Sequence, residues 1–228
     1  ADARHIAFPG EVRRSTSHIE FRNVRELGAK GDGVRDDTAA FVDSVDVGPL
    51  VLDTDGGTWV AVGRASPARV GVWRLENGSL VDGATGLEPG GEALRSNLVV
   101  HRWNGVEHLA AVTDDGVWTW NPTDGAQLAP TGDPFDHDGR LVAWPDGDDD
   151  RRLVFADTTG AVLELVRQAD DTWSRATFGD ALDAAPVGDL AVADLDGDGR
   201  IDLVLCSETL ISARHASGVE IVGFPKRL

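Results

Sequence analysis

The stretch LAVADLDGDGRIDLVLC, residues 190–206, places acidic side chains at alternate positions between two apolar runs. Its glycines, Gly197 and Gly199, permit the positive φ angles that a tight loop requires. Carboxylate and carbonyl oxygens are the ligands that Ca²⁺ prefers in proteins. We therefore expect one structural Ca²⁺ here, bound by Asp194, Asp196, Asp198, the carbonyl of Arg200 and Asp202.

This loop differs from an EF-hand, which needs a helix on each side and a glutamate at its twelfth position. Here the twelfth position is Leu205, and the flanking runs Leu190–Ala193 and Leu203–Cys206 are rich in residues typical of strands. The pattern indicates a calcium loop within a β-hairpin. An acidic hairpin turn that binds no metal is the alternative interpretation.

The surroundings of the loop recur in weaker form at intervals of about 43 to 49 residues. Each copy is an apolar run, a turn and a second apolar run, and most copies continue into a third run that is rich in aromatic or aliphatic residues. This period, with four short strands per unit, is typical of a β-propeller. The copies begin at Leu50, Leu98, Leu141 and Leu190.

Residues 190–205 resemble the FG-GAP or VCBS type of repeat, in which a D-x-D-x-D-G-x-x-D loop joins the first two strands of a propeller blade. Only this last copy matches fully, so the resemblance implies one bound Ca²⁺. The first copy keeps Asp53 and Asp55, and the second has lost the ligands. The third keeps three acidic residues in altered spacing, namely Asp146, Asp148 and Asp150.

The chain of 228 residues has a formal net charge of −18, with 39 acidic residues but only two lysines among its 21 basic ones. An acidic, lysine-poor surface keeps a protein soluble where salt screens its self-repulsion. This composition resembles that of proteins from extremely halophilic archaea. Nucleic acid is not an expected partner, because no basic stripe is present to neutralise phosphates. No run is long enough for a membrane span, and Ala1–His5 shows no signal peptide.

Residues 1–45 do not follow the blade pattern. Their segment FRNVRELGAKGDGVRDDTAAFV, residues 21–42, is similar to the opening motif of the pectate-lyase-like superfamily, which is frequent in viral tail spikes and polysaccharide-degrading enzymes. On physical grounds, Asp36 or Asp37 can cap a short helix over residues 38–44. We interpret this segment as an attachment arm, without the lyase activity of that superfamily.

Motifs for catalysis are not visible: the chain contains no zinc-ligand spacing, nucleophile elbow or Walker loop. His101 and His108 are expected to face each other across a hairpin. The seven tryptophans are expected mainly in the cores between blades, with a sugar-stacking tryptophan at the rim as the alternative. The lone Cys206 is expected to be a small buried apolar side chain.

The sequence thus predicts an all-β fold: an irregular arm at 1–45 with one short helix, and a β-propeller at 46–228 with four blades or, alternatively, five. The preferred function is a non-enzymatic structural and binding module of a haloarchaeal virion, as a spike, fibre or turret for host attachment. The alternatives are a polysaccharide-degrading lyase or glycosidase and a secreted haloarchaeal cell-surface adhesion protein. No catalytic residue is predicted.

The expected partners are other virion or cell-surface proteins, held through the arm. A host glycan and a second copy of the chain are further expected partners. Without a visible signal peptide, the virion interpretation places the protein outside the cell in a high-salt environment. These expectations rest on analogy with the fold and the N-terminal motif.

Overall fold

The computed structural model describes residues 47–54, 57–64, 67–77, 79–81, 87–121, 125–145, 151–183, 186, 190–207 and 210–227. The predicted arm at 1–45, the short helix expected within it and the acidic stretch at 146–150 lie outside these ranges. The described part is all-β, as predicted, and no described helix has the length and apolar character to cross a bilayer.

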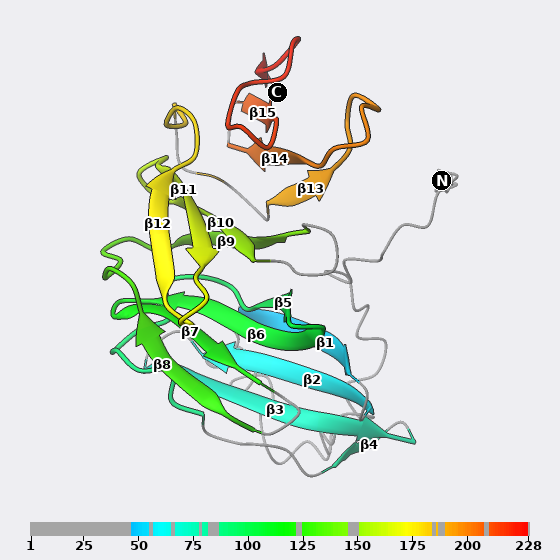
Figure 1. Ribbon diagram of the computed structural model, residues 1–228. Helices are drawn as coiled ribbons and strands as arrows, with labels where there is room; N and C mark the ends of the chain where they lie inside the picture. The colour runs from blue at the N-terminus through cyan, green and yellow to red at the C-terminus, as the bar shows by residue number, and fades with distance from the viewer. Residues whose placement is uncertain are drawn as a thin grey trace, which may run out of the picture.

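Within the described ranges, sixteen strands form four antiparallel sheets of four strands each, in chain order (Figure 1). Sheet 1 contains β1 (Val47–Thr54), β2 (Gly57–Arg64), β3 (Arg69–Glu76) and β4 (Ser79–Val81). Sheet 2 contains β5 (Val99–Trp103), β6 (Val106–Thr113), β7 (Gly116–Trp120) and β8 (Gln127–Thr131). Sheet 3 contains β9 (Gly139–Trp144), β10 (Arg152–Asp157), β11 (Val162–Arg167) and β12 (Trp173–Thr177). Sheet 4 contains β13 (Ala191–Ala193), β14 (Asp202–Cys206), β15 (Leu210–Arg214) and β16 (Lys226–Arg227).

The predicted repeat therefore corresponds to one sheet, and each sheet is built from successive hairpins. Strands alternate their side chains between two faces, so a sheet with apolar residues at every position is buried on both sides. Sheet 2 is of this kind, because every residue of β7 is buried. Such a unit is stable only between two neighbours, which is the reason that propeller blades stack around an axis.

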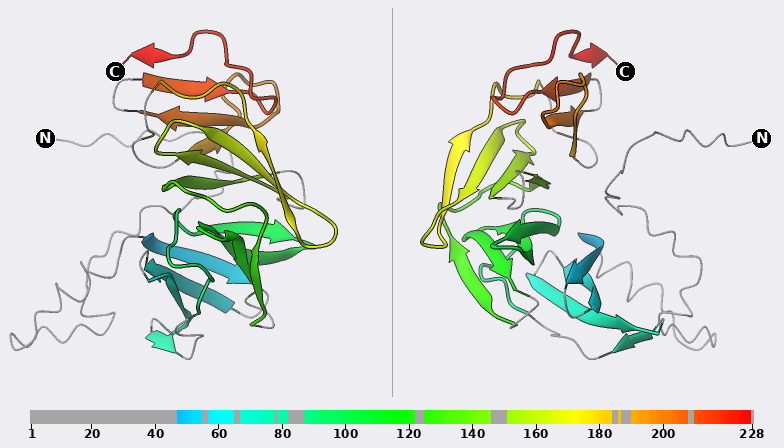
Figure 2. Two further views of the ribbon diagram at one scale, coloured as in Figure 1. Left: turned by 90° about the vertical axis from the view of Figure 1, so that its left-hand side faces the viewer. Right: turned by 45° about the vertical axis from the view of Figure 1, so that its right-hand side comes forward.

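Three clusters of buried apolar side chains lie between consecutive sheets. Trp118 and Trp120 of sheet 2 pack on Ala61, Val70 and Val72 of sheet 1. The second cluster joins sheets 2 and 3, and the third joins sheets 3 and 4. Among the described residues, no such cluster joins sheet 4 to sheet 1. The four sheets follow an arc that stays open on one side (Figure 2).

The sheets pack with larger residues against smaller ones. The face of each sheet toward the preceding sheet carries mainly leucine and aromatic side chains, as with Leu153 and Phe155 in sheet 3. The opposite face carries mainly valine and alanine, as with Val154 and Ala156 in the same strand. The exceptions, Trp59 and Trp144, lie near strand ends. Large side chains seated on small ones pack closely within these three clusters.

Polar contacts fix the neighbouring sheets in register. The amide side chain of Asn97 donates to the Leu141 carbonyl at 2.9 Å and accepts from the Leu141 amide at 2.8 Å, which links the start of sheet 2 to sheet 3. Between sheets 3 and 4, the backbone itself makes the contact. A Cβ built on Gly179 would lie 2.3 Å from the Gly218 carbonyl oxygen, so only glycine fits there.

The tryptophans occupy the cores, as predicted. Of the seven, five are buried and two, Trp59 and Trp73, are half-buried, so none forms an exposed stacking platform. His101 and His108 pair directly across the β5–β6 hairpin, with ring centroids 5.4 Å apart, and both are buried. Cys206 is half-buried, so it is more accessible than predicted.

Candidate metal-binding loop and inter-sheet pocket

The acidic loop joins β13 to β14 as the hairpin predicted from the sequence, and it turns on Gly197 and Gly199. Both glycines have positive φ, 79° and 82°, and a Cβ on either would meet no atom within 4 Å. The demand for glycine is therefore conformational and does not arise from crowding. Both strands of this hairpin belong to sheet 4.

Three of the predicted ligands lie together. Carboxylate oxygens of Asp194, Asp196 and Asp202 lie within 4.8 Å of one another. Ca²⁺ binds oxygen at 2.3–2.6 Å, so two ligands on opposite sides of one ion are about 5 Å apart. The spacing and the chemistry of this donor set fit Ca²⁺. The carboxylate of Asp198 is not part of the group and accepts a hydrogen bond from the Arg200 amide at 2.8 Å.

Backbone amides hold these carboxylates in place. The two oxygens of Asp194 accept from Gly197 N at 2.8 Å and from Gly199 N at 3.0 Å. Asp196 accepts from Asp198 N at 3.1 Å. A carboxylate has about four lone-pair positions, so an oxygen that accepts one hydrogen bond retains capacity for a cation.

Asp202 differs from the other two because it has no exposed surface, whereas Asp194 and Asp196 are exposed. Its Oδ2 accepts from Leu195 N at 3.0 Å, and its Oδ1 lies 3.1 Å from Nδ1 of His215. Since a carboxylate only accepts, His215 donates this bond. His215 follows β15 and was not singled out from the sequence, because its contact with Asp202 spans 13 positions of the chain.

The corresponding loops of sheets 1 and 3 cannot be compared with this one. The side chains of Asp53 and Asp55, and all of residues 146–150, lie outside what the structure describes. The predicted loss of ligands in the second copy is visible, because Asn104 and Gly105 there form a two-residue turn between β5 and β6.

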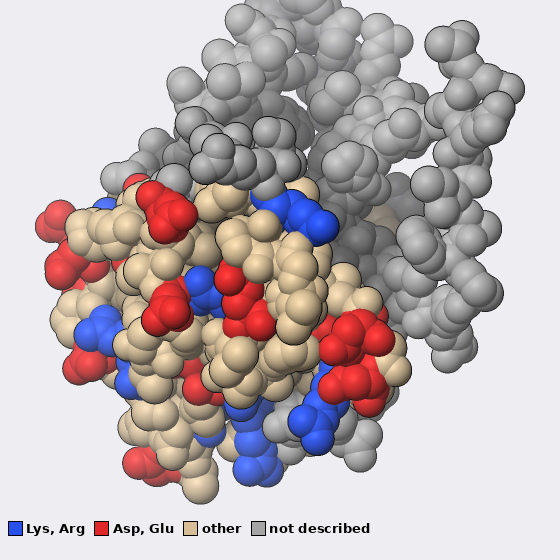
Figure 3. All heavy atoms as spheres, turned by 90° about the horizontal axis from the view of Figure 1, so that it is seen from above, with Lys and Arg blue, Asp and Glu red and all other residues tan. Residues whose placement is uncertain are grey.

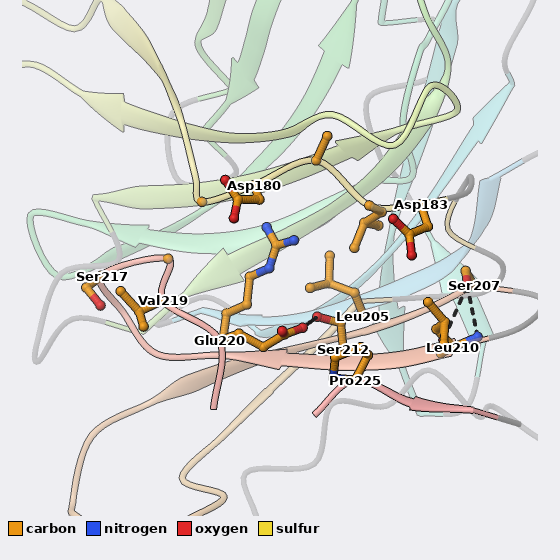
Figure 4. Close-up of a pocket in the computed structure, with 15 residues that line it drawn as sticks. Asp180, Asp183, Leu205, Ser207, Leu210, Ser212, Ser217, Val219, Glu220 and Pro225 are labelled. Atoms are coloured by element: carbon orange, nitrogen blue, oxygen red, sulfur yellow. Dashed lines mark hydrogen bonds between the residues drawn. The ribbon is translucent and has the colours of Figure 1, made fainter. Parts of the chain in front are cut away.

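A pocket of about 420 Å³ lies between the end of sheet 3 and sheet 4 (Figure 4). Its walls combine leucine, valine and proline with three carboxylates, those of Asp180, Asp183 and Glu220. The hydroxyl of Ser212 donates to Glu220 at 3.0 Å. None of the described residues that line the pocket is a histidine, so among them this pair has no base of the kind found in a Ser–His–acid arrangement.

Arg214 is the buried cation of the pocket and has 4% of its surface exposed. Its Nη1 donates to the Phe178 carbonyl at 2.9 Å, which ties sheet 4 to the end of sheet 3. Burial lowers the pKa of Arg214, and the carboxylates of Glu220 and Asp180 act in the opposite direction. The sequence pattern did not indicate this pocket, because its walls come from two repeats.

A second arginine cluster surrounds Trp103 at the end of β5. The guanidinium carbons of Arg167 and Arg151 lie 4.9 and 5.1 Å from its ring centroid. Burial lowers the pKa of Arg167, whereas its ion pair with Asp171 raises it. These contacts give Trp103 a structural role between sheets 2 and 3.

On the face that Figure 3 shows, the acidic groups of the described residues are dispersed, with basic side chains among them. Examples are the ion pairs of Arg95 with Asp138 and of Arg175 with Asp133, at 3.0 and 3.4 Å. The charge is therefore distributed over a folded surface, as the spread of carboxylates along the sequence predicted.

Comparison with solved structures identifies the fold as propeller-like. The chain is similar to the β-propeller domain of Cps50 (Swd1) from Myceliophteria thermophila, with 14% identity, a TM-score of 0.52, and coverage of 79% of this chain and 55% of that one. An ancestral GH74 enzyme matches with 16% identity and a TM-score of 0.51 over 78% of this chain and 27% of that one. The WD40 domain of SCAP from fission yeast matches with 12% identity and a TM-score of 0.50 over 81% and 42%.

The chain thus spans about half of the first of these structures and less of the other two. At such identities the likeness concerns the fold alone, and these neighbours include both a WD40 domain and an enzyme. No protein-family model matches the chain. No curated protein matches it either. The class defined so far is an all-β protein of propeller-like architecture, a fold that suits binding and structural modules in general.

Proposed function

We propose that the chain is a non-enzymatic binding and assembly module in which Ca²⁺ rigidifies the β13–β14 hairpin of sheet 4. The observation that supports it is the group of carboxylate oxygens of Asp194, Asp196 and Asp202 within 4.8 Å. These three side chains would hold the ion, and Ca²⁺ would supply charge neutralisation in a loop where four acidic residues stand within nine positions. Its role is structural.

Calcium removal tests this proposal directly. A ligand that binds only the native state stabilises it by about 2.7 kcal/mol at 100 times its Kd. Chelation with EGTA at constant high salt should therefore lower the melting temperature of the protein, and added Ca²⁺ should restore it. Differential scanning calorimetry measures the shift, and isothermal titration gives the stoichiometry, expected to be one ion per chain.

Two variants and a control locate the site. Asp196→Ala should abolish the calcium-dependent shift in melting temperature. Asp170→Ala is the control and should retain the shift, because Asp170 lies in a separate exposed turn, where it accepts hydrogen bonds from Thr172. Asp198→Ala decides whether the fourth carboxylate joins the ligand set when the ion binds. An identical melting curve with and without Ca²⁺ in the wild-type protein would refute the proposed metal.

The finer part of the proposal is that this module belongs to a haloarchaeal virion, as a spike, fibre or turret that attaches to the host surface and works outside the cell. The acidic, lysine-poor composition and the tail-spike-like motif at residues 21–42 support it. The arm at 1–45 would bind neighbouring virion proteins, and the propeller would bind a host glycan. Immunogold labelling of purified particles tests the location, and a glycan array built from host-surface glycans tests the recognition.

The salt response tests the halophilic part separately. With a net charge of −18, the folded chain should lose stability as salt is diluted, because screening of its carboxylates weakens. Full stability in dilute buffer would contradict it. The polysaccharide-degrading alternative predicts depolymerisation of host glycans that is lost on substitution of carboxylates in the inter-sheet pocket, such as Asp180→Asn.

A further inference from the structure

Both end sheets of the arc have an outward face that no described sheet covers. In sheet 1 these side chains alternate with the buried Ala61, Val70 and Val72, and in sheet 4 they alternate with the buried Leu203 and Leu205. On sheet 1 the outward residues are Val60, Val62, Trp73 and Leu75. On sheet 4 they are Ala191, Ala193, Val204, Cys206, Ile211 and Ala213.

These faces are apolar and, apart from the buried Ala213 on sheet 4, accessible. Leu75 is 38% exposed, Ala191 and Ala193 are exposed, and Val204 and Cys206 are half-buried. The charged residues there stand at strand ends: Arg69 pairs with Glu88 at 2.9 Å, Asp202 bonds to His215, and the exposed Lys226 lies opposite Ile211 on the edge strand β16. A chain with 26% charged residues thus leaves two sheet centres uncharged, as expected for surfaces that become covered.

The two open faces are complementary in side-chain size, as are the faces that meet at the three contacts within the arc. Within the arc, larger side chains face the preceding sheet and smaller ones face the following sheet. The outward face of sheet 4 is small, with three alanines, whereas that of sheet 1 presents the large Trp73 and Leu75. Sheet 4 is therefore built to receive a sheet of the type that sheet 1 presents.

We propose that two copies of this chain close a ring of eight sheets, in which sheet 4 of each copy packs on sheet 1 of the other. Both open faces are then buried at once, and no uncovered face remains. A head-to-tail contact closes into a ring when its rotation fits and otherwise grows into a filament. Two copies need each arc to span about half a ring, and this chain aligns with 55% of the Cps50 (Swd1) propeller domain.

A second copy fits these faces better than the chain's own N-terminal 46 residues. Covering both faces requires a sheet-like surface on each side of the opening (Figure 2). Residues 1–45 lack the succession of apolar runs that forms each sheet, whereas a second copy supplies both complementary surfaces. The inference rests on the apolar residues of the two faces and not on bound Ca²⁺. Of the acidic carboxylate group, only the buried Asp202 lies on the sheet 4 face, at the start of β14.

Sedimentation velocity and light scattering over a concentration series test the ring at fixed salt and Ca²⁺. We expect a species of twice the chain mass of 24.2 kDa. Val204→Glu and the milder Ala191→Arg, at an exposed position, should each weaken association by about 100-fold or more, because a charge would be buried in the contact. Val219→Glu, at a residue that is 62% exposed and lies off this face, is the matched control and should remain dimeric.

A mixing experiment tests the head-to-tail arrangement. Leu75→Glu, on sheet 1, should also give folded monomers. When it is mixed with Ala191→Arg, one of the two contacts in the mixed ring is unaltered and the other pairs opposite charges, so dimers should reappear. A wild-type monomer or filament, unchanged association of the variants, or no recovery on mixing would each overturn the proposal. Circular dichroism shows whether each variant is folded.

Discussion

The hairpins β5–β6 and β13–β14 occupy the same place in the repeat and are closed by different means. In sheet 2 the turn is Asn104-Gly105, with φ of 52° and 75°, and the facing side chains are buried histidines. In sheet 4 the connection is a longer acidic loop held by carboxylates. The same hairpin can thus be closed by a two-residue turn or by a longer loop, and only the longer loop gathers carboxylate oxygens at a spacing that fits a cation.

The largest effect should come from the apolar core that sheet 2 depends on. Trp118 is fully buried between sheets 1 and 2, so Trp118→Ala should lower the free energy of unfolding by about 3–5 kcal/mol. Trp118→Phe keeps most of the volume and removes a buried indole N–H that has no acceptor, so it should cost clearly less. Chemical denaturation measures both, and equal losses would show that ring volume does not decide this core.

In sheet 4, the stability of the β13–β14 hairpin should depend on Asp202. In the presence of chelator, so that no metal contributes, Asp202→Ala leaves the Leu195 amide and His215 without their acceptor and should cost about 2–3 kcal/mol. Asp202→Asn retains one acceptor oxygen and should lose less. If Asp202→Ala is neutral without metal, the loop does not depend on this carboxylate for its apo fold.

The turn of sheet 2 should respond only to backbone substitutions. Gly105→Ala meets no atom within 4 Å, so its cost is that of a positive φ on alanine, about 1 kcal/mol. Asn104→Gly is the control. Because glycine also tolerates a positive φ, this substitution should change the free energy of unfolding by about a few tenths of a kcal/mol. Thermal unfolding with and without Ca²⁺ should give the same loss, and a calcium-dependent loss would contradict the contrast between the two hairpins.

A small pH dependence should arise outside the acidic loop, at Asp114 in the β6–β7 turn. Burial raises its pKa, but hydrogen bonds from the Ala93 and Glu92 amides and the charge of Arg95 outweigh this and hold the pKa below its ordinary value. Its contribution to stability is therefore present above the unfolded-state pKa and is lost as pH falls through the folded one. Asp114→Asn should flatten the acid limb of the stability curve slightly, and an unchanged limb would contradict the assignment.

Much of the fold was predictable because it is encoded locally. Each sheet follows from successive apolar runs and turn residues, and the pairing of His101 with His108 follows from the two-residue turn between them. The acidic loop was predictable for the same reason, since Asp194, Asp196 and Asp202 lie within nine positions.

What the sequence did not reveal depends on contacts between residues that are far apart in the chain, whether between repeats or within one. Arg214 reaches Phe178 across 36 positions, and His215 reaches Asp202 across sheet 4. The open side of the arc depends on the angles between sheets, which no local pattern encodes. Arg214 in particular is one of 19 arginines, and nothing in its neighbourhood of sequence sets it apart.

The meeting of Gly179 and Gly218 bears on the curvature of the whole assembly. Because main chain touches main chain there, no side chain separates sheets 3 and 4 at that one point. Even a methyl group at either position would wedge the two sheets apart on that side and change the radius of the arc. The number of sheets that fit into a closed ring would then depend on the absence of a side chain at Gly179 and Gly218.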